Sequence, residues 1–291
     1  MTVSIIIRAK NEEVPITRVL KTICGQTSVK LHEVIIVDSG STDSTVAVAR
    51  RFGATIVHIA PQQFTYGYAL NFGIRHSSGE IVCSLSAHCT PCSNEWLAEL
   101  TEPIRQRNAH ATYGRQVPVK GINPFEELFL QRRFPEGEHL SGRVPFSNAN
   151  CAFIRRMWEE VQFDERIPSW EDYLWYLKTR DSFQFRYAPR AVVTHSHPFS
   201  FGRLMHTAIQ DGRAFRYLKE RRGVDIFSEA GSGAGRLRYA AEDLLSHSLF
   251  FLKQGYYGPL FMLPFVKLYS YMNYLRGYYA SAGGSAHGAR A

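Results

Sequence analysis

The chain of 291 residues lacks two features that mark secreted proteins. Its cysteines are odd in number and irregularly spaced, which argues against the paired framework of a small secreted protein. They are Cys24, Cys83, Cys89, Cys92 and Cys151. The first residues also lack the basic segment followed by an apolar segment that forms a secretory leader. We therefore expect a cytoplasmic protein with reduced thiols.

The C-terminal part lacks an apolar run that could span a membrane. Its charge-free run, residues 254–266, contains two prolines and is too short. The wider segment 244–279 is rich in aromatic residues and carries Lys253, Lys267 and Arg276. This composition is typical of helices that lie on an anionic membrane surface. Alternatively, these helices pack on the rest of the chain or on a second subunit in a homo-oligomer.

Acidic residues are outnumbered by basic ones, and the net charge is +8 with a pI near 9.3. Such a balance indicates acidic partners. No motif for binding RNA or DNA accompanies the charge, so we expect lipid or phosphate-bearing partners and no nucleic acid. An apolar content of 45% allows an ample core.

Alternating strand and helix patterns occupy the first part of the chain. Apolar runs predict strands at 4–8, 33–38, 55–58 and 80–85, and amphipathic segments predict helices at 11–24, 68–76 and 94–105. This order predicts an α/β fold with a mostly parallel sheet. After Tyr113 the alternation weakens, with helices expected at 124–134 and 170–178 and strands at 146–153 and 191–195. Beyond Phe199 the pattern is helical, up to a small, polar tail over 281–291 that we expect to be disordered.

The predicted strand 33–38 ends in a carboxylate, Asp38, which a Ser/Gly turn follows. Open α/β sheets bind ligands at the carboxyl ends of their strands, so Asp38 is a candidate ligand contact. The alternative is that Asp38 only caps the next helix. For that helix we expect Thr42 as the N-cap and Asp43 in the first turn.

Four motifs, taken in order, resemble those of the family 2 glycosyltransferases, which have the GT-A nucleotide-sugar-binding fold. They are Ser4-Ile5-Ile6-Ile7-Arg8-Ala9-Lys10-Asn11-Glu12, Val37-Asp38-Ser39-Gly40-Ser41-Thr42-Asp43, Ala69-Leu70-Asn71-Phe72-Gly73-Ile74 and Trp170-Glu171-Asp172. The Asp-Ser-Gly-Ser form is similar to rhamnosyltransferase-like members of bacterial polysaccharide pathways. The resemblance implies a Rossmann-like GT-A catalytic domain over 1–198 and a helical C-terminal region over 199–280, ahead of the tail over 281–291.

The resemblance also makes Asp38 a donor contact, to the base or the ribose of a UDP- or dTDP-linked sugar. A carboxylate accepts well from the imide N–H of uracil or thymine, because the hydrogen bond is charge-assisted. Ala9 and Glu12, where the first strand ends, would flank the same pocket. This chain has Ser39 where many relatives carry a second acid.

Glu171 and Asp172 stand at the start of a predicted helix, where adjacent side chains do not face the same way. By resemblance, Asp172 is the general base of an inverting transfer, and it takes the proton of the acceptor hydroxyl. Glu171 would lie in the acceptor region with Asn148 and Asn150. The segments Gly114-Arg115-Gln116 and Ser147-Asn148-Ala149-Asn150 are expected to line the cleft between donor and acceptor or, alternatively, only to anchor polar loops. The implied acceptor is a glycan or a polyprenyl-linked glycan at the inner face of the plasma membrane. The alternative for the two acids is a solvated helix terminus.

The chain lacks the acidic pair with which the family holds a divalent metal against the donor diphosphate. The corresponding segment reads Ser86-Ala87-His88, so Ser86 and His88 are expected to face the donor. Imidazole binds Mn²⁺ but is a poor ligand for Mg²⁺, which demands oxygen. His195 and His197, two apart after a strand, point to one face and could join His88 at a metal. The alternative is a metal-free site in which basic groups such as Arg115 balance the diphosphate.

Three other functions compete with glycosyl transfer. The missing acidic pair would suit a protein that binds sugar nucleotides without transferring the sugar. A nucleotidyltransferase shares the sheet topology but would show a Gly-rich phosphate loop where this chain has Ala9-Lys10-Asn11-Glu12. The segment Cys89-Thr90-Pro91-Cys92 has the spacing of a redox dithiol, although the motifs around it belong to another fold.

Overall fold

The computed structural model describes residues 1–137, 146–224 and 233–280, so the expected tail over 281–291 lies outside the described residues. The chain divides into two compact units. The sheet unit consists of Met1–Val119, Leu130–Arg166 and Glu171–Ser196, and the helical unit consists of Lys120–Phe129, Ile167–Trp170 and His197–Ala291. The helical unit thus includes three segments from the range 1–198, which the sequence assigns to one domain: Lys120–Phe129, Ile167–Trp170 and residues 197–198.

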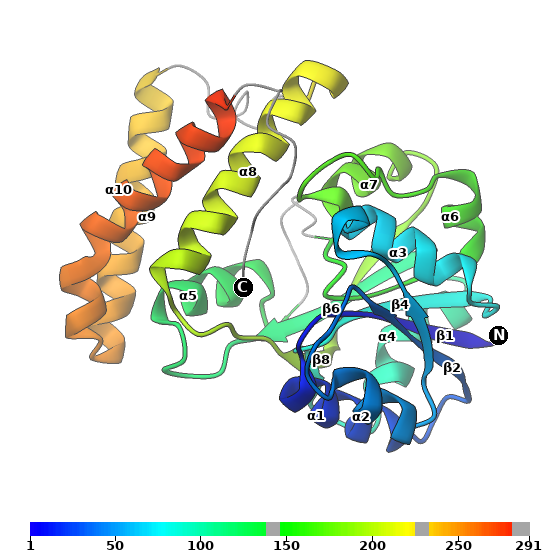
Figure 1. The fold of residues 1–291 in the computed structure, drawn as a ribbon. Coiled ribbons are helices and arrows are strands. Elements are labelled where there is room, and N and C mark those ends of the chain that lie inside the picture. Colours follow the sequence, from blue (N-terminus) through cyan, green and yellow to red (C-terminus); the bar gives the residue numbers. More distant parts are fainter. Residues whose placement is uncertain (138–145, 225–232, 281–291) are drawn as a thin grey trace. The chain divides into compact units, whose positions relative to one another are not determined.

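The sheet unit is built on an eight-stranded sheet with the strand order β3-β2-β1-β4-β7-β6-β8-β5 (Figure 1). The strands are β1 (Val3–Ala9), β2 (Leu31–Asp38), β3 (Thr55–His58), β4 (Ile81–Ser86), β5 (Thr90–Pro91), β6 (Ala111–Val117), β7 (Asn150–Ile154) and β8 (Phe185–Thr194). β3, β2, β1 and β4 are parallel neighbours, which confirms the α/β prediction. β7 runs antiparallel to both β4 and β6, so the sheet is mixed beyond β4.

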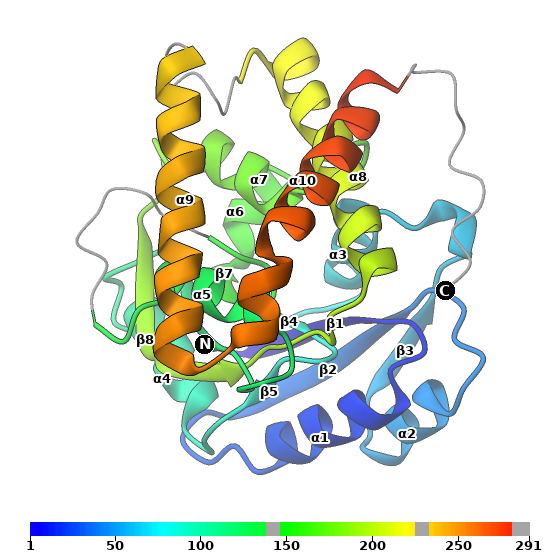
Figure 2. The same ribbon diagram turned by 90° about the vertical axis from the view of Figure 1, so that its left-hand side faces the viewer.

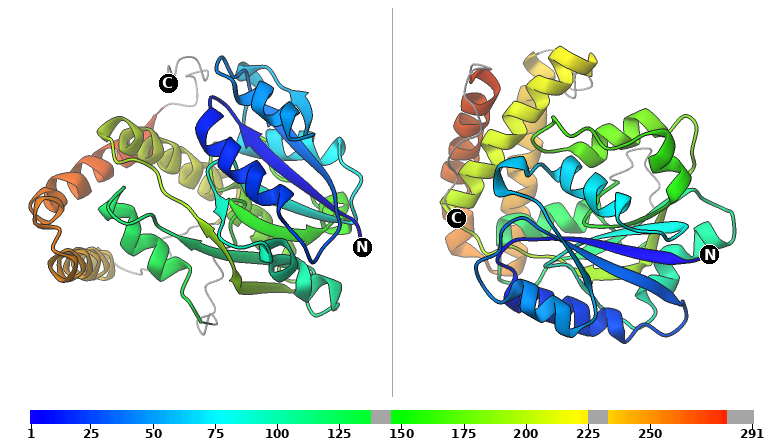
Figure 3. Two further views of the ribbon diagram at one scale, coloured as in Figure 1. Left: turned by 90° about the horizontal axis from the view of Figure 1, so that it is seen from below. Right: turned by 45° about the vertical axis from the view of Figure 1, so that its right-hand side comes forward.

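Helices cover both faces of this sheet (Figure 3). They are α1 (Glu13–Cys24), α2 (Thr45–Arg51), α3 (Tyr66–Arg75), α4 (Trp96–Arg105), α6 (Arg155–Glu160) and α7 (Glu171–Thr179). Ile5 and Ile7 of β1 pack in the apolar cluster that contains α1 and α4, whereas Ile6 packs in the cluster that contains α3. Successive side chains of a strand point to opposite faces, so a central strand covered on both sides needs an unbroken apolar run.

The turn after β2 differs from its prediction. α2 begins at Thr45, so Thr42 is not its N-cap and Asp43 lies before its first turn. The Oδ1 atom of Asp43 accepts a hydrogen bond from the Thr45 backbone N–H at 2.9 Å and satisfies one free donor at the helix start. The Thr42 backbone N–H instead donates to Asn11 Oδ1 at 2.8 Å. This bond ties the turn after β2 to the turn after β1.

Asn71 on α3 ties that helix to the segment that precedes α7. The residue is 1% exposed. Its Nδ2 donates to the Phe163 carbonyl at 2.9 Å and to Glu165 Oε1 at 2.8 Å. Its Oδ1 accepts from Trp158 Nε1 at 2.8 Å and from the Phe163 backbone N–H at 3.2 Å. The amide group is therefore fully used inside the protein.

We expect Asn71→Leu to lower the free energy of unfolding by about 3 kcal/mol, because two buried N–H groups would lose their acceptor. Urea denaturation followed by circular dichroism measures this loss. Asn108→Leu is the control, since Asn108 is an exposed asparagine and its replacement should change the stability by less than about 0.5 kcal/mol. Equal stabilities of the two variants would contradict the structural role of Asn71.

The helical unit contains α8 (Phe201–Arg222), α9 (Gly233–Gln254), α10 (Tyr257–Tyr279) and the first part of α5 (Pro124–Arg133). α8 and α10 lie side by side (Figure 2), and glycines allow their close approach. A Cβ atom on Gly212 would meet the Tyr274 carbonyl, and one on Gly277 would meet the Ile209 carbonyl. Among the described residues, no helix has the length and apolar character needed to cross a membrane.

Candidate active site

The turns that follow β1 and β2 meet at the carboxyl edge of the sheet. Ala9 is aligned with Asp38, and the Ser39 backbone N–H donates to the Ala9 carbonyl at 3.1 Å. The Asp38 carboxylate accepts from the backbone N–H of Gly40 at 3.1 Å and of Ser41 at 3.2 Å. Gly40 has a φ of 89°, a conformation that favours glycine. The Asp38 side chain is only 3% exposed, and His58 Nδ1 also lies 3.3 Å from its Oδ2, so its contact with a donor stays a prediction.

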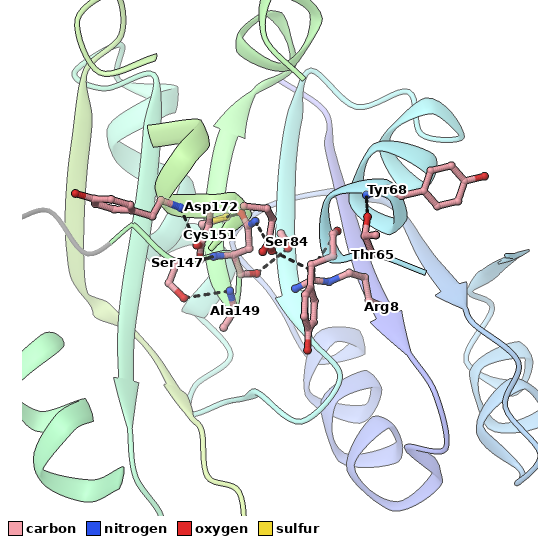
Figure 4. A network of polar contacts seen from close by, with 12 residues as sticks. Arg8, Thr65, Tyr68, Ser84, Ser147, Ala149, Cys151 and Asp172 are labelled. Carbon is pink, nitrogen blue, oxygen red and sulfur yellow. Dashed lines mark hydrogen bonds and ion pairs between the residues drawn. The ribbon is translucent and has the colours of Figure 1, made fainter. Parts of the chain in front are cut away.

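Two acids begin α7, and Asn148 holds both of them. Its Nδ2 donates to Glu171 Oε1 at 3.3 Å, and its backbone N–H donates to Asp172 Oδ2 at 3.2 Å. Glu171 also forms an ion pair with Arg8 at 3.2 Å, in which the two side chains are only 7% and 13% exposed. Asp172 is half-buried, and its Oδ1 accepts from the Tyr173 backbone N–H at 2.7 Å. Figure 4 shows this network, with Arg8 on β1 and Asp172 at the start of α7.

The two neighbouring acids have different electrostatic surroundings. Burial and the charge of Asp172 raise the pKa of Glu171, although Arg8 opposes this shift. Burial lowers the pKa of Arg133, against the charge of Asp172. Arg133 at the end of α5 is thus close enough to Asp172 for their charges to interact. Glu171 is a buried acid neutralised by a cation, whereas Asp172 is fixed by backbone N–H groups and remains accessible.

His88, Cys89 and His195 come together where β4 and β8 end. One ligand atom from each residue lies within 4.8 Å of the other two, and the histidine ring centroids are 5.2 Å apart. β5 pairs antiparallel with the end of β8, where Thr90 is aligned with Thr194, and so brings the two segments together. The structure therefore unites His88 with His195, as a shared metal site requires.

The remaining predicted residues lie in different surroundings. Ser86 ends β4, and its backbone N–H donates to the Ala149 carbonyl at 3.1 Å. Arg115 pairs with Glu136 at 3.4 Å, and its Nε is buried without a hydrogen-bond partner among the described residues. His197 belongs to the helical unit, where its Nδ1 lies 3.0 Å from Glu126 Oε1. Its metal role stays a prediction.

Asn150 is fully buried, and its amide joins β7 to its neighbours. Its Oδ1 accepts from Trp96 Nε1 at 3.0 Å, and its Nδ2 donates to the Ala191 carbonyl at 2.9 Å and the Arg115 carbonyl at 3.2 Å. These bonds occupy the side chain. We therefore assign Asn150 a structural role in place of the predicted acceptor contact.

Two residues near the site, His58 and Arg133, were missed by sequence reasoning. His58 Nδ1 lies 3.3 Å from Asp38 Oδ2, and a signal existed, because both residues end neighbouring parallel strands. Arg133 stands next to Arg132 at the end of α5, and nothing in the sequence separates the two. Gln116, which the sequence predicts to line the cleft, has its Oε1 2.6 Å from His195 Nδ1.

Residues 4–163 match the family model of Glycosyl transferase family 2, which amounts to more than half of the chain. The chain therefore belongs to glycosyltransferase family 2. The O-antigen chain rhamnosyltransferase WbaN of Salmonella anatum is 26% identical over 183 residues, or 58% of each chain. Glycosyltransferase AglE of Haloferax volcanii is 38% identical over 101 residues, or 33% of each chain. The chain thus spans between 33% and 60% of the length of the curated relatives that it matches.

Solved structures share the fold at low sequence identity. The mannosyltransferase PcManGT from Pyrobaculum calidifontis, in complex with GDP-Man and Mn²⁺, has a TM-score of 0.62 at 19% identity and covers 95% of this chain and 87% of its own. The glucosyl-3-phosphoglycerate synthase from Mycobacterium tuberculosis, in complex with Mn²⁺, UDP and its product, has a TM-score of 0.58 at 21% identity. It covers 77% of this chain and 80% of its own. These likenesses confirm the predicted GT-A-type fold.

Proposed function

We propose that this protein is an inverting glycosyltransferase that uses a UDP- or dTDP-linked sugar and a glycan or lipid-linked glycan acceptor. The observation that carries the proposal is the Asp172 carboxylate, which backbone N–H groups hold at the start of α7 in a family 2 chain. Two curated relatives named O-antigen chain rhamnosyltransferases support transfer to a growing polysaccharide.

In the proposed reaction, Asp172 takes the proton of an acceptor hydroxyl while the hydroxyl oxygen forms a bond to the anomeric carbon. The bond from that carbon to the diphosphate oxygen breaks on the opposite face, and its electron pair leaves with the nucleoside diphosphate. A single in-line displacement inverts the anomeric configuration. The hydrogen bonds from the Asn148 and Tyr173 backbones orient Asp172 before the substrate binds, which lowers the entropic cost of the step.

In the proposed complex, the donor nucleotide contacts Asp38, Ala9 and Glu12. The positive charge of Arg115 balances the diphosphate. The mannosyltransferase and glucosyl-3-phosphoglycerate synthase structures described above contain Mn²⁺. In this chain the groups at the end of β4 are two imidazoles and a thiol. Mg²⁺ demands oxygen ligands, so this ligand set does not suit it, whereas imidazole can bind Mn²⁺. In the proposed step, residues of the chain supply the base and positive charge for the diphosphate.

A transfer assay tests the function. The protein is incubated with UDP-, dTDP- and GDP-linked sugars and glycan acceptors, and nucleoside diphosphate release and product mass are measured. We expect one nucleoside diphosphate per sugar transferred and, by NMR, an anomeric configuration opposite to that of the donor. Donor binding without transfer to any acceptor would favour a sugar-nucleotide-binding protein, and release of pyrophosphate would favour a nucleotidyltransferase.

An apolar stripe on the helical unit supports a membrane-bound acceptor. We define the apolar stripe as the exposed side chains that follow helical spacing on α9 and α10: Leu245, Leu249, Leu252, Phe261, Phe265, Leu268 and Met272. Lys253 and Arg276 are exposed on the same two helices, whereas Lys267 is paired with Asp243 at 2.6 Å. Exposed apolar residues next to basic ones suit a bilayer interface with anionic lipids. We place the protein at the inner face of the plasma membrane, as a peripheral protein.

The double substitution Phe261→Glu with Phe265→Glu should weaken binding to anionic vesicles more than tenfold. Each substitution removes about 1.5–3 kcal/mol of free energy gained by burying a phenylalanine in the bilayer. Each glutamate is also repelled by the anionic lipids. Flotation with phosphatidylglycerol vesicles measures the effect. Val14→Glu, at a residue of the sheet unit that is 62% exposed, is the control and should float as the wild type does. If the double variant floats as the wild type does, the stripe does not bind the membrane. If the wild type is a dimer and the double variant is a monomer, the stripe is a subunit interface instead.

A further inference from the structure

The cluster of His88, Cys89 and His195 has a ligand set unlike the acidic pair that it replaces. Its ligand atoms are two imidazole nitrogens and one sulfur, mutually within 4.8 Å. The two histidines are half-buried and the cysteine is fully buried. A metal ion bound there would have protein on the thiol side and an approach from the histidine side.

Both imidazoles are oriented by acceptors from other elements. Glu12 Oε1 lies 3.3 Å from His88 Nδ1, and Gln116 Oε1 lies 2.6 Å from His195 Nδ1. An oxygen atom facing each Nδ1 suits the neutral tautomer in which Nδ1 donates and Nε2 offers its lone pair to a metal. Metal-binding histidines are held in this way, with one ring nitrogen donating to a carboxylate or carbonyl oxygen. Gln116 is only 2% exposed, so its support for His195 is built into the core.

The chemistry of these three ligand atoms determines which metal ion the cluster binds. Imidazole and thiolate are borderline and soft ligands that suit Zn²⁺, Co²⁺ and similar transition metals, whereas Mg²⁺ requires oxygen ligands. Three protein ligands with one open position is the arrangement of catalytic zinc sites. The open position can accept an oxygen atom from a ligand such as a diphosphate.

We propose that His88, Cys89 and His195 form a site for a Zn²⁺-class transition metal that discriminates against Mg²⁺. Binding replaces the proton on Cys89 Sγ with the metal, and the proton passes to solvent. The role of the ion at the donor diphosphate rests on the proposed function, but its binding does not. Cys89 is the residue that distinguishes this site from one made by histidines alone.

Cobalt spectroscopy tests the site without any activity measurement. The metal-stripped full-length protein is titrated with Co²⁺, and we expect one ion per chain with a near-ultraviolet thiolate-to-cobalt charge-transfer band. Cys89→Ser should lose this band. Cys92→Ser is the matched control and should keep it, because Cys92 is an exposed thiol three residues further along the chain. Gln116→Leu should weaken Co²⁺ binding by about 10–100-fold, since it removes the oxygen that orients His195.

Competition experiments on the wild-type protein make the proposal independent of the variants. Zn²⁺ should displace Co²⁺ and abolish the band, and excess Mg²⁺ should leave it unchanged. Absence of the band in the wild type, its persistence in Cys89→Ser, or its loss on addition of Mg²⁺ would overturn the proposal. Metal binding without glycosyl transfer would refute only the proposed function, and full transfer in EDTA by a protein that shows no band would refute only the metal site.

Discussion

Replacing Asp172 with asparagine is expected to lower kcat by about 10²–10⁴-fold while donor affinity stays near that of the wild type. Asparagine has nearly the shape of aspartate, and its Oδ1 can still accept from the Tyr173 N–H, although its Nδ2 cannot accept from the Asn148 N–H. It cannot take a proton from the acceptor hydroxyl. The loss should therefore fall on the transfer step and not on folding or on binding of the donor.

Single-turnover transfer with saturating donor measures the chemical step, and calorimetry with the nucleoside diphosphate measures donor binding. Asp181→Asn is the control, because Asp181 follows α7 and its side chain is 91% exposed. It should transfer the sugar at the wild-type rate. Retained turnover in Asp172→Asn would exclude Asp172 as the base, and loss of donor binding in the same variant would show a structural role instead.

The substitution Arg8→Met should lower the free energy of unfolding by about 3–5 kcal/mol. Arg8 and Glu171 are almost fully buried in their ion pair, so removing the cation leaves a carboxylate without its counter-charge in a site of low polarity. Arg8→Met combined with Glu171→Gln should recover much of the loss, because no buried charge remains. Arg156→Met, which breaks an exposed pair with Glu160, should cost less than about 1 kcal/mol.

The stability lost in Arg8→Met should depend on pH. Burial and Asp172 already raise the pKa of Glu171, and removing Arg8 raises it further. Above the ordinary glutamate pKa of about 4.3, the folded variant then binds more protons than the unfolded chain. Its stability consequently falls as pH rises, and the deficit relative to the wild type should narrow toward pH 4. Urea titrations across this pH range measure the trend, and a constant deficit would argue against a buried charge as the cause.

The parallel half of the sheet could be predicted because its strands are unbroken apolar runs. The predicted strand at 55–58 coincides with β3, and the helix expected at 11–24 closely matches α1. The start of β8 was harder to predict. The strand begins at Phe185, whereas the predicted strand begins at residue 191. Its first residues alternate between exposed and half-buried positions and include charged side chains, so no apolar run marks them.

Motif resemblance pointed to Asp38 and Asp172, and the roles of these residues stay predictions. The sequence also paired His88 with His195, which the structure brings together. The partners that hold such groups are distant in sequence, as Arg8 is from Glu171, and no local pattern connects them. For Asn150 the sequence leaves a cleft contact and a loop anchor open, and its burial among three hydrogen-bond partners favours the anchor.

Under the proposed function, the bond between the Thr42 N–H and Asn11 Oδ1 bears on how a donor nucleotide is bound. It belongs to a set in which the Asn11 N–H also donates to Ser41 Oγ at 2.9 Å and the Glu12 N–H donates to Thr45 Oγ1 at 2.7 Å. Two loops that brace each other in this way lose little conformational entropy when a nucleotide arrives. Affinity can then come from few direct contacts, and amide hydrogen exchange in these loops should already be slow in the free protein.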